Sequence, residues 1–471
     1  MVNSTALAEL EKQTQSFSNG QSWTNGSKYG FYSDSCSANS SSKAIIQTQD
    51  GQFLWDAKTR GIILGSFFYG FVATELPGGW LAYKFGGKWI FAIGMLWTSI
   101  FTLLTPLTVH LDLPLLIAVR VLEGFGEGAA FPCVPSMLAM WAPPAERSRL
   151  NMITLAGTGI GAMIGFPFSA ALCNTDMGWP LLFYVFGIIG IGWCIVWTIF
   201  ASSSPSTSYW ISVQERKYIE DSLAGISSKK EENSCCSVPW LAIIKTPAIW
   251  AVLISHISFT WGTYTVITLL PSFFKQVLNL DLSSNGLNSS LPYICYMIVA
   301  FAAGPISDYL ILNRILSPTV VRKIMDGMGH VLPGIFLLLT TVIGCNVPVA
   351  VLLMCLAVGS QAFVGAGEIS SILDVSGRFA GLIYGFINTM GAMCGVVAPY
   401  VAGVITQNDP TITGWRSVFG IAAGLYFIAS LIFTIFGSGE TAEWARADQA
   451  PKPDAYNCEA EATDEKKSRK F

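Results

Sequence analysis

Residues 179–202 read WPLLFYVFGIIGIGWCIVWTIFAS, a run of twenty-four residues without a charged side chain. The hydrocarbon core of a bilayer is about 30 Å thick, and a helix needs about 20 mostly apolar residues to cross it. The run therefore predicts a transmembrane helix.

Segments of the same kind recur on both sides of this run, and eleven candidates meet the length requirement. We therefore expect an all-α integral membrane protein with about eleven transmembrane helices. The candidate spans cover residues 60–82, 89–108, 113–140, 150–173, 179–202, 248–272, 287–310, 322–344, 346–372, 379–405 and 414–437.

The composition supports a membrane protein. Charged residues make up only 12% of the 471 residues, against about 25% in typical soluble domains, and 52% are apolar. The formal net charge of −3 offers no basic surface for DNA or RNA. The eleven cysteines show no metal-ligand spacing, and no nucleophile–base pair or phosphate-binding loop stands out. We expect no enzyme, no metal or other cofactor and no nucleic-acid partner; the bilayer is the expected surrounding.

Lysine and arginine residues in the short connections predict the orientation, because cytosolic loops carry an excess of them. One alternating set of connections holds thirteen and the other only Lys275 and Arg416. The larger set is expected in the cytosol together with the C-terminal tail. It comprises Lys84, Lys88, Arg147, Arg149, Arg216, Lys217, Lys229, Lys230, Lys245, Arg314, Arg322, Lys323 and Arg378.

This orientation predicts five regions. Residues 1–58 form a polar luminal or extracellular segment, in which sequons at Asn3, Asn25 and Asn39 favour a glycoprotein. Two helix bundles are separated by a cytosolic linker, and a cytosolic tail ends the chain. The bundles cover 59–202 with five helices and 247–438 with six, the linker covers 203–246 and the tail 439–471.

A long polar N-terminal segment without a signal-peptide pattern has to cross the membrane. A helix preceding Met1 would explain this and would give two groups of six helices, the layout of a secondary transporter. We therefore expect a chain that lacks a first helix; an eleven-helix variant is the alternative.

The third span carries three ionisable side chains, Arg120, Glu123 and Glu127, on one helical face. Such groups at membrane depth are costly and face a bundle interior or a wet cavity. Arg120 can pair with Glu123, and two acids one turn apart repel, so that one of them holds a proton near neutrality. We expect proton coupling at Glu123 and Glu127, with a purely structural ion pair as the alternative.

Further polar groups lie within other spans. Glu75 is a second candidate for a proton or cation site, and the alternative is a carboxylate capped near a helix end. The same two interpretations apply to Glu368. His256 and His330 are expected to be hydrogen-bonded residues of the interior. Glycines in two spans are expected to let neighbouring helices approach. They are Gly124, Gly126, Gly128, Gly157, Gly161 and Gly165.

Charged residues at two helix–loop–helix corners are candidates for a conformational latch, with topology signalling as the other explanation. The first corner carries Lys84 and Lys88, and its counterpart in the second half carries Asp308 and Arg314. Aromatic side chains are candidates to line a substrate cavity, although most membrane aromatics only pack or anchor. Among them are Phe67, Phe68, Tyr69, Trp261 and Tyr264.

Several of these segments resemble the major facilitator superfamily, and more narrowly its sialin, vesicular glutamate transporter and type I sodium–phosphate cotransporter family. The sialin branch is the most similar, and the resemblance runs from about residue 54 to 445. It rests on Gly65-Ser-Phe-Phe-Tyr-Gly, Pro77-Gly-Gly, Arg120–Pro132, Trp141-Ala-Pro-Pro-Ala-Glu-Arg-Ser, Leu269-Leu-Pro, Ser290-Leu-Pro-Tyr, Leu373-Asp-Val, Ala380-Gly and Ile387-Asn-Thr.

The resemblance implies a two-bundle fold with the family's first helix missing. It also implies that Arg120, Glu123 and Glu127 occupy positions involved in proton coupling and anion handling. Tyr264 and Asn388 match family residues near the substrate cavity. Phe68, Tyr69 and Arg120 are further candidates for substrate binding.

Departures from the family pattern reduce the range of candidate substrates. Leu64 and Phe259 stand where vesicular glutamate transporters carry His and Arg, which counts against glutamate. Glu75 replaces a typical Gln, and Met1 falls on the position of a substrate-binding Arg. Two further departures are Pro135 in place of sialin's His, and Ser371-Ile372 in place of the family's Asn-His.

The sequence thus predicts alternating-access transport of a small organic or inorganic anion, coupled to H⁺ or Na⁺. The expected location is a lysosomal, vesicular or plasma membrane, with the C-terminus in the cytosol. The alternative is a truncated, transport-incompetent isoform that acts as an interaction or regulatory membrane protein.

Overall fold

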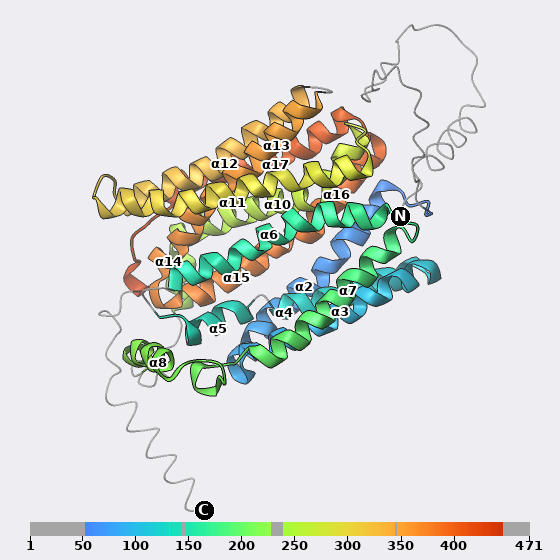
Figure 1. Ribbon diagram of the computed structural model, residues 1–471. Coiled ribbons are helices and arrows are strands. Elements are labelled where there is room, and N and C mark those ends of the chain that lie inside the picture. Colours follow the sequence, from blue (N-terminus) through green and yellow to red (C-terminus); the bar gives the residue numbers. More distant parts are fainter. Residues whose placement is uncertain (1–51, 131, 144–146, 228–238, 344–345, 446–471) are drawn as a thin grey trace, which may run out of the picture.

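The computed structural model describes residues 52–130, 132–143, 147–227, 239–343 and 346–445. Residues 1–51, which include the three sequons, and the tail from 446 lie outside the described residues, as does part of the expected linker. The described residues are almost entirely helical (Figure 1).

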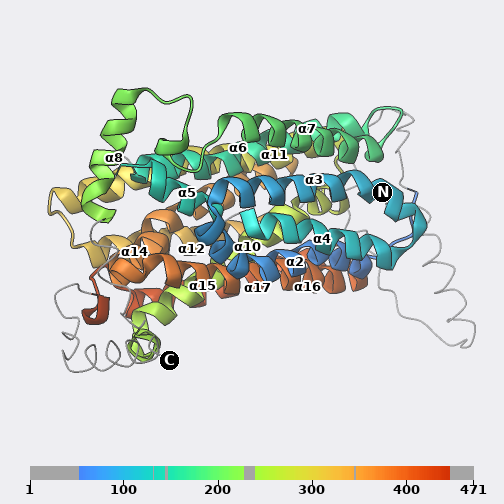
Figure 2. The same cartoon turned by 90° about the horizontal axis from the view of Figure 1, so that it is seen from below.

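The first half of the described chain contains six helices before the linker. They are α2 (Ala57–Phe85), α3 (Gly87–Leu111), α4 (Leu113–Ala130), α5 (Cys133–Trp141), α6 (Arg147–Cys173) and α7 (Trp179–Phe200). The linker region holds the short η1 (Pro205–Thr207), α8 (Val213–Ser227) and α9 (Trp240–Lys245). Figure 2 shows α8 lying across the direction of the long helices.

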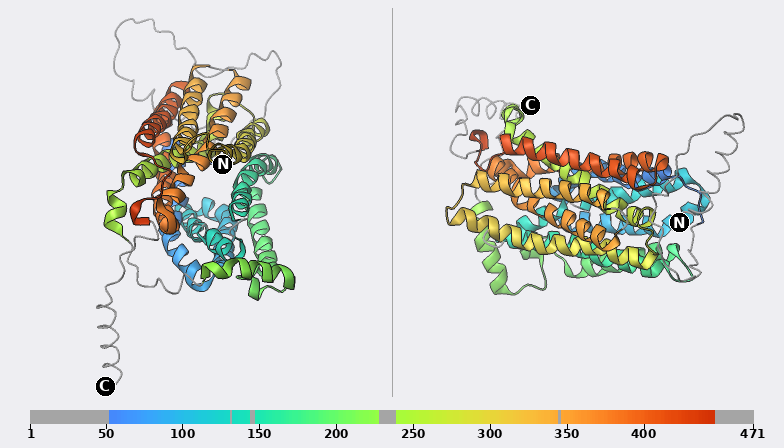
Figure 3. Two further views of the ribbon diagram at one scale, coloured as in Figure 1. Left: turned by 90° about the vertical axis from the view of Figure 1, so that its left-hand side faces the viewer. Right: turned by 90° about the horizontal axis from the view of Figure 1, so that it is seen from above.

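The second half forms another group. It contains α10 (Pro247–Gln276), α11 (Leu282–Leu312), α12 (Pro318–Val342), α13 (Val347–Gln361), η2 (Gly365–Ile369), α14 (Ser370–Ser376), η3 (Gly377–Phe379), α15 (Ala380–Ala392), α16 (Cys394–Asn408), α17 (Ile412–Phe436) and η4 (Glu443–Ala445). Viewed along the helices, the two groups lie side by side as an N-terminal and a C-terminal bundle (Figure 3).

Within the described residues, eight helical segments are long and apolar enough to cross a membrane. They coincide with eight of the eleven expected spans. The expected span at 113–140 is divided into α4 and α5, and α4 carries three ionisable residues, which lowers its hydropathy. Those at 60–82 and 150–173 coincide with α2 and α6. The all-α, two-bundle architecture that the sequence predicts is confirmed.

The surface of the bundles suits a lipid environment. α7 exposes large apolar residues such as Ile188, Ile189 and Ile195, each more than half accessible. A soluble monomer rarely exposes an apolar face of this extent. In the C-terminal bundle the largest buried side chains pack together between α10 and α17, and include Phe273, Trp415 and Phe419. The apolar outer surface and the packed interior together describe a multi-pass membrane protein.

The long helices end in two layers of connections. We call the layer at 86, 142–143, 201–227, 239–246, 313–317 and 377–379 the basic end, and the other layer the opposite end. Eleven of the thirteen basic residues described above lie in these connections or in the adjoining helix ends, and Lys229 and Lys230 lie outside the described residues. The bundles touch near the opposite end. There Gly61 and Gly65 of α2 face the backbone of Pro399 and Val396 in α16, and α6 packs on α11.

Small residues make this approach possible, because a side chain on Gly61 would meet the carbonyl of Pro399 at 2.5 Å. On the other side of the interface, a side chain on Gly286 of α11 would meet Cβ of Ala170 in α6 at the same distance. Asn174 Nδ2 also donates to Ser283 Oγ at 2.8 Å. Two helix pairs, α2–α16 and α6–α11, therefore hold the bundles together near the opposite end.

The helix α11 begins at the opposite end with an N-cap. Asp281 accepts a hydrogen bond from the backbone N–H of Ser284 at 3.1 Å. Hydrogen bonds from the side chain and the backbone of Ser284 hold the pKa of Asp281 below its usual value.

Replacing Asp281 by Ala is expected to lower the free energy of unfolding by about 1 kcal/mol at neutral pH, because the cap is lost. A lowered folded-state pKa adds stability above the unfolded-state pKa of about 3.9, and that part is lost as the pH falls through the folded value. Thermal unfolding of the purified protein at about pH 7 and about pH 3 measures both effects. Asp281→Asn is the matched control, since Asn also caps; equal stability of Ala and Asn variants at neutral pH would contradict the prediction.

Candidate functional site

The ionisable residues of α4 form an ion pair within the N-terminal bundle. Arg120 Nη1 lies 2.5 Å from Glu123 Oε2, and the guanidinium sits 5.6 Å from the centre of the Phe67 ring. Thr105 of α3 donates to the other oxygen, Glu123 Oε1, at 2.8 Å. Glu123 is buried and directed toward α3, whereas a quarter of the Arg120 side chain is exposed. The Arg120–Glu123 pairing expected from the spacing is thus present.

Glu127 lies one turn further along α4 and is partly buried. It interacts electrostatically with both Arg120 and Glu123. The three groups therefore act on one another, as the sequence predicts. Their geometry accommodates both a proton shared between the acids and a structural ion pair.

The α4 glycines are a packing surface. A side chain on Gly124 or Gly128 would meet the α2 backbone, and one on Gly126 would meet Gly94 and Thr98 of α3. The packing role expected for these residues is confirmed. The same expectation is wrong for Gly157, Gly161 and Gly165 of α6, where no atom of another helix among the described residues lies within 4 Å of the position a Cβ would take.

Glu75 and Asn388 meet across the two bundles. Asn388 Nδ2 of α15 donates to Glu75 Oε1 of α2, and the residues are 313 positions apart in the chain. Glu75 is only 4% exposed, and its Oε2 has no hydrogen-bond partner. A candidate cation-coupling residue and a candidate substrate-binding residue therefore touch at the interface between the bundles.

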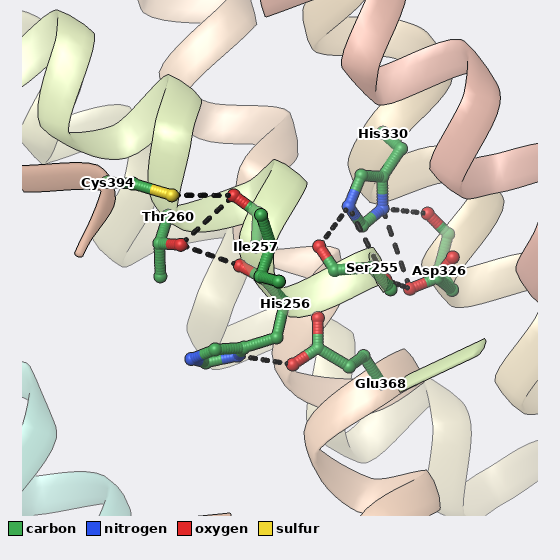
Figure 4. Close-up of polar contacts among 8 residues, drawn as sticks. All are labelled: Ser255, His256, Ile257, Thr260, Asp326, His330, Glu368 and Cys394. Atoms are coloured by element: carbon green, nitrogen blue, oxygen red, sulfur yellow. Dashed lines mark hydrogen bonds and ion pairs between the residues drawn. The ribbon is translucent and has the colours of Figure 1, made fainter. Parts of the chain in front are cut away.

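His256 and Glu368 form a second buried pair next to this contact. His256 Nδ1 of α10 lies 2.5 Å from Glu368 Oε1, and both side chains are at most 3% exposed (Figure 4). Glu368 belongs to η2, a single turn of π-helix, a feature often found at functional sites. His256 also interacts electrostatically with Glu75. The hydrogen-bonded interior histidine expected from the sequence is found here.

A third polar group, Ser255, Asp326 and His330, lies beside this pair, above and to its right in Figure 4. Ser255 Oγ donates to Asp326 Oδ1 at 2.7 Å, and His330 Nδ1 lies 3.5 Å from the same oxygen. Sequence reasoning missed Asp326. An acid and a histidine at i and i+4 within one apolar span were the signal, because residues so spaced share a helix face.

The aromatic candidates differ from one another in their contacts and in their exposure. Phe68 of α2 lies edge-on to Tyr264 of α10, with ring centres 4.6 Å apart, so this contact also joins the bundles. Phe68 packs closely against Gly395 of α16. Tyr69 is 58% exposed. Phe68 lies two turns before Glu75 on α2, and Tyr264 of α10 interacts electrostatically with Glu75, so both rings are near the Glu75–Asn388 contact.

The latch candidates lie at the basic end. Lys84 is placed over the rings of Trp80 and Phe85, and Lys88 over that of Trp89. Asp308 and Arg314 are exposed. The structure thus gives the two lysines aromatic neighbours on their own helices.

Another basic residue joins helices at this end. Arg322 of α12 donates through Nε to Asp374 of α14 at 2.8 Å, and through Nη1 to Ser307 of α11 and the carbonyl of Ala366 at 3.0 and 2.9 Å. Arg322 was expected only to mark a cytosolic loop. Its bonds connect three segments of the C-terminal bundle.

Comparison with known families settles the class of protein. The model of the Major Facilitator Superfamily matches residues 35–399, more than three quarters of the chain. The chain belongs to the major facilitator superfamily. Its members that resemble this chain are transporters, and the expectation that the protein is not an enzyme is confirmed.

Similar proteins indicate which branch of this superfamily the chain resembles. Sialin of Homo sapiens is 38% identical over 418 residues, covering 88% of this chain and 83% of sialin. A putative inorganic phosphate cotransporter of Drosophila ananassae is 38% identical, covering 85% and 83%. The chloroplastic ascorbate transporter of Arabidopsis thaliana is 37% identical, covering 83% and 70%. The resemblance to the sialin and type I phosphate cotransporter branch is thereby confirmed.

Solved structures show the same fold. A bacterial homologue of the lysosomal transporter Spinster matches with a TM-score of 0.63 at 15% identity, covering 85% of this chain and 92% of that one. A D-xylose–proton symporter also gives 0.63, at 14% identity, with 82% and 89% covered. At these identities the likeness establishes the major facilitator fold.

Proposed function

We propose that this major facilitator protein is a secondary active transporter of a small anion, coupled to H⁺ or Na⁺ by alternating access. The names of its relatives include inorganic phosphate and ascorbate, both anions at neutral pH. Arg120 provides a partly exposed positive charge within the N-terminal bundle. A guanidinium suits this role because it stays charged and binds carboxylate or phosphate in a fixed geometry.

The observation that carries the proposal is the contact between Glu75 and Asn388. It places a buried carboxylate of one bundle against an amide of the other. An ionised carboxylate accepts a stronger hydrogen bond than a neutral acid, so protonation or cation binding at Glu75 weakens this link. The released Asn388 amide can then bind substrate.

Coupling requires that ion and substrate shift the same equilibrium between two conformations. In the proposed cycle Glu123 and Glu127 share the coupling proton, and Glu75 is a second site for proton or cation. Phe68, Tyr69 and Tyr264 line the substrate site with Asn388 and Arg120. Proton release permits the two bundles to rock, while Lys84, Lys88, Asp308 and Arg314 latch the corners at the basic end.

On the basis of the positive-inside rule, we propose that the basic end and the C-terminus face the cytosol. Because two sialins are among the relatives, we propose the lysosomal membrane as the location. Protease protection of tagged termini in intact organelles tests the orientation.

Uptake into proteoliposomes tests the proposed function. The purified protein is expected to accumulate at least one radiolabelled anion from a panel of sialic acid, phosphate, ascorbate, urate and glutamate. Accumulation should increase more than about tenfold over protein-free vesicles when an inward H⁺ or Na⁺ gradient is imposed, since about 1.4 kcal/mol of gradient supports a tenfold ratio. Binding of these anions without uptake of any would favour an interaction or regulatory protein instead.

A further inference from the structure

The ring of His330 has hydrogen-bond acceptors on both sides. Its Nδ1 lies 3.0 Å from the backbone carbonyl oxygen of Asp326, and its Nε2 lies 3.2 Å from that of Ser255. A carbonyl oxygen only accepts, and a neutral imidazole has a single N–H to donate. Both bonds form together only when both ring nitrogens carry a proton. The Ser255 hydroxyl does not replace the second proton, because it donates to Asp326.

Two carboxylates beside this ring have oxygens without partners. Asp326 Oδ2 and Glu368 Oε2 are buried and have no hydrogen-bond partner, and neither residue is accessible to solvent. One ligand atom from each of Asp326, His330 and Glu368 lies within 4.8 Å of the others. An unpaired carboxylate oxygen in so dry a place costs several kcal/mol unless a proton or cation binds it.

Formal charges leave this region with a net negative charge unless a carboxylate binds a proton. Glu75, Asp326 and Glu368 contribute three negative charges when ionised, and His256 and His330 contribute two positive charges when protonated. Burial disfavours the remaining negative charge. One additional proton on a carboxylate makes the group neutral and gives the free oxygens a donor.

Within the part of the chain that the structure describes, the neighbouring elements supply no positive charge that compensates these carboxylates. Arg322 precedes Asp326 by one turn, yet its bonds go to Asp374, Ser307 and the Ala366 carbonyl. The other groups that face the site carry hydroxyls or amides. They are Gln361 of α13 and Tyr426 of α17, bonded to each other at 2.7 Å, Tyr384 of α15, whose ring is 6.1 Å from that of His256, and Asn388 of α15.

We propose that Asp326, His330 and Glu368 form a buried proton-binding site in the C-terminal bundle. His256 connects it to the Glu75–Asn388 contact between the bundles, so that protonation inside one bundle reaches the surface it shares with the other. The connection runs from Glu368 to His256 at 2.5 Å and on to Glu75 through their electrostatic interaction. The role in coupling rests on the proposed function, whereas proton binding itself does not.

Infrared spectroscopy of the lipid-reconstituted protein tests proton binding without any transport. The difference spectrum between roughly pH 5 and pH 8, where imidazoles titrate, is expected to contain the carbonyl stretch of a buried protonated carboxylic acid. Asp326→Asn or Glu368→Gln should remove or shift that band, and His330→Gln should change the pH at which it appears. The matched controls are Asp176→Asn and His110→Gln, which alter an exposed acid and the histidine outside the site, and should leave the band unchanged.

Three results would overturn the proposal. In the first, the Asn and Gln variants fold, as judged by gel filtration, and keep the wild-type band. In the second, Na⁺ but not pH changes the spectrum, which would make the site a metal-cation site. In the third, an intact wild-type protein shows no buried-acid band at any pH. Because two separate isosteric variants are used, failure of one to fold leaves the other to decide.

The same variants test the proton-binding site and the proposed transport function independently of each other. If uptake fails in the wild type while the carboxylic-acid band is present and sensitive to Glu368→Gln, the proton site stands and the transport proposal falls. If wild-type uptake follows the pH gradient, Glu368→Gln and Asp326→Asn are expected to reduce that uptake more than about tenfold. Unchanged pH-driven uptake in both variants would remove the site from coupling.

Discussion

Replacing Glu123 by Gln is expected to abolish anion uptake driven by a pH gradient. The amide keeps the size of the side chain: its oxygen can still accept a hydrogen bond from Arg120, and its NH₂ group can donate to the Thr105 hydroxyl, so the helix packing of α4 on α3 is retained. It cannot bind and release a proton. The loss should exceed about tenfold in the initial rate, while anion exchange at equal pH on both sides of the membrane continues.

The matched control is Glu220→Gln. Glu220 pairs with Arg216 at 3.0 Å, as Glu123 pairs with Arg120, but both residues lie exposed on α8. Exposed ion pairs contribute little, so this variant should insert and transport as the wild type does. Gradient-driven uptake that persists in Glu123→Gln would leave the Arg120–Glu123 pair with a structural role only.

Replacing Gly124 by Ala is expected to destabilise the N-terminal bundle by about 3 kcal/mol. A methyl group there would meet the carbonyl oxygen of Phe67 and lie 2.8 Å from the backbone nitrogen of Phe71, so α4 and α2 must move apart. Backbone atoms cannot turn aside as a flexible side chain can. The measurement is the thermal unfolding temperature in detergent, together with the monodisperse yield.

Gly161→Ala is the comparison that separates the effect of helix packing on stability from the effect of helix propensity. No atom lies within 4 Å of the new methyl position in α6, and Ala favours a helix over Gly by roughly 0.5–1 kcal/mol. This variant should therefore be as stable as the wild type or more so. Equal destabilisation by both substitutions would show that backbone freedom, and not the contact between α2 and α4, is what the glycines provide.

The sequence predicts those features that depend on neighbours along the chain. Long apolar runs determine the spans, and the pairing of Arg120 with Glu123 follows from residues one turn apart. The role of Gly124 follows from the density of glycines in α4. The same argument fails for Gly161, because residue spacing within one helix does not show whether a neighbouring helix lies opposite the glycine.

Contacts between distant segments could not be predicted in this way. Glu75 and Asn388 are 313 residues apart, and only the assembled bundles bring them together. The pairing of His256 with Glu368 also depends on a π-helical turn in η2, which reorients Glu368 relative to a regular helix. Asp326 has one recognisable partner along the chain, His330 one turn away, and its bond with Ser255 depends on the assembled bundle. Buried polar networks are tertiary features, and a single sequence carries little of their geometry.

The seam between α2 and α16 is built from main chain and small side chains, with Gly61, Gly65 and Gly403 placed against Pro399, Val396 and Ala57. The strength of such dispersion contacts does not vary with acidity. The contact between α2 and α16 therefore keeps nearly the same strength when the pH changes. In the proposed transport cycle, protonation acts instead on the Glu75–Asn388 contact beside this seam, and small changes in the free energy of that contact decide which of the two conformations is favoured.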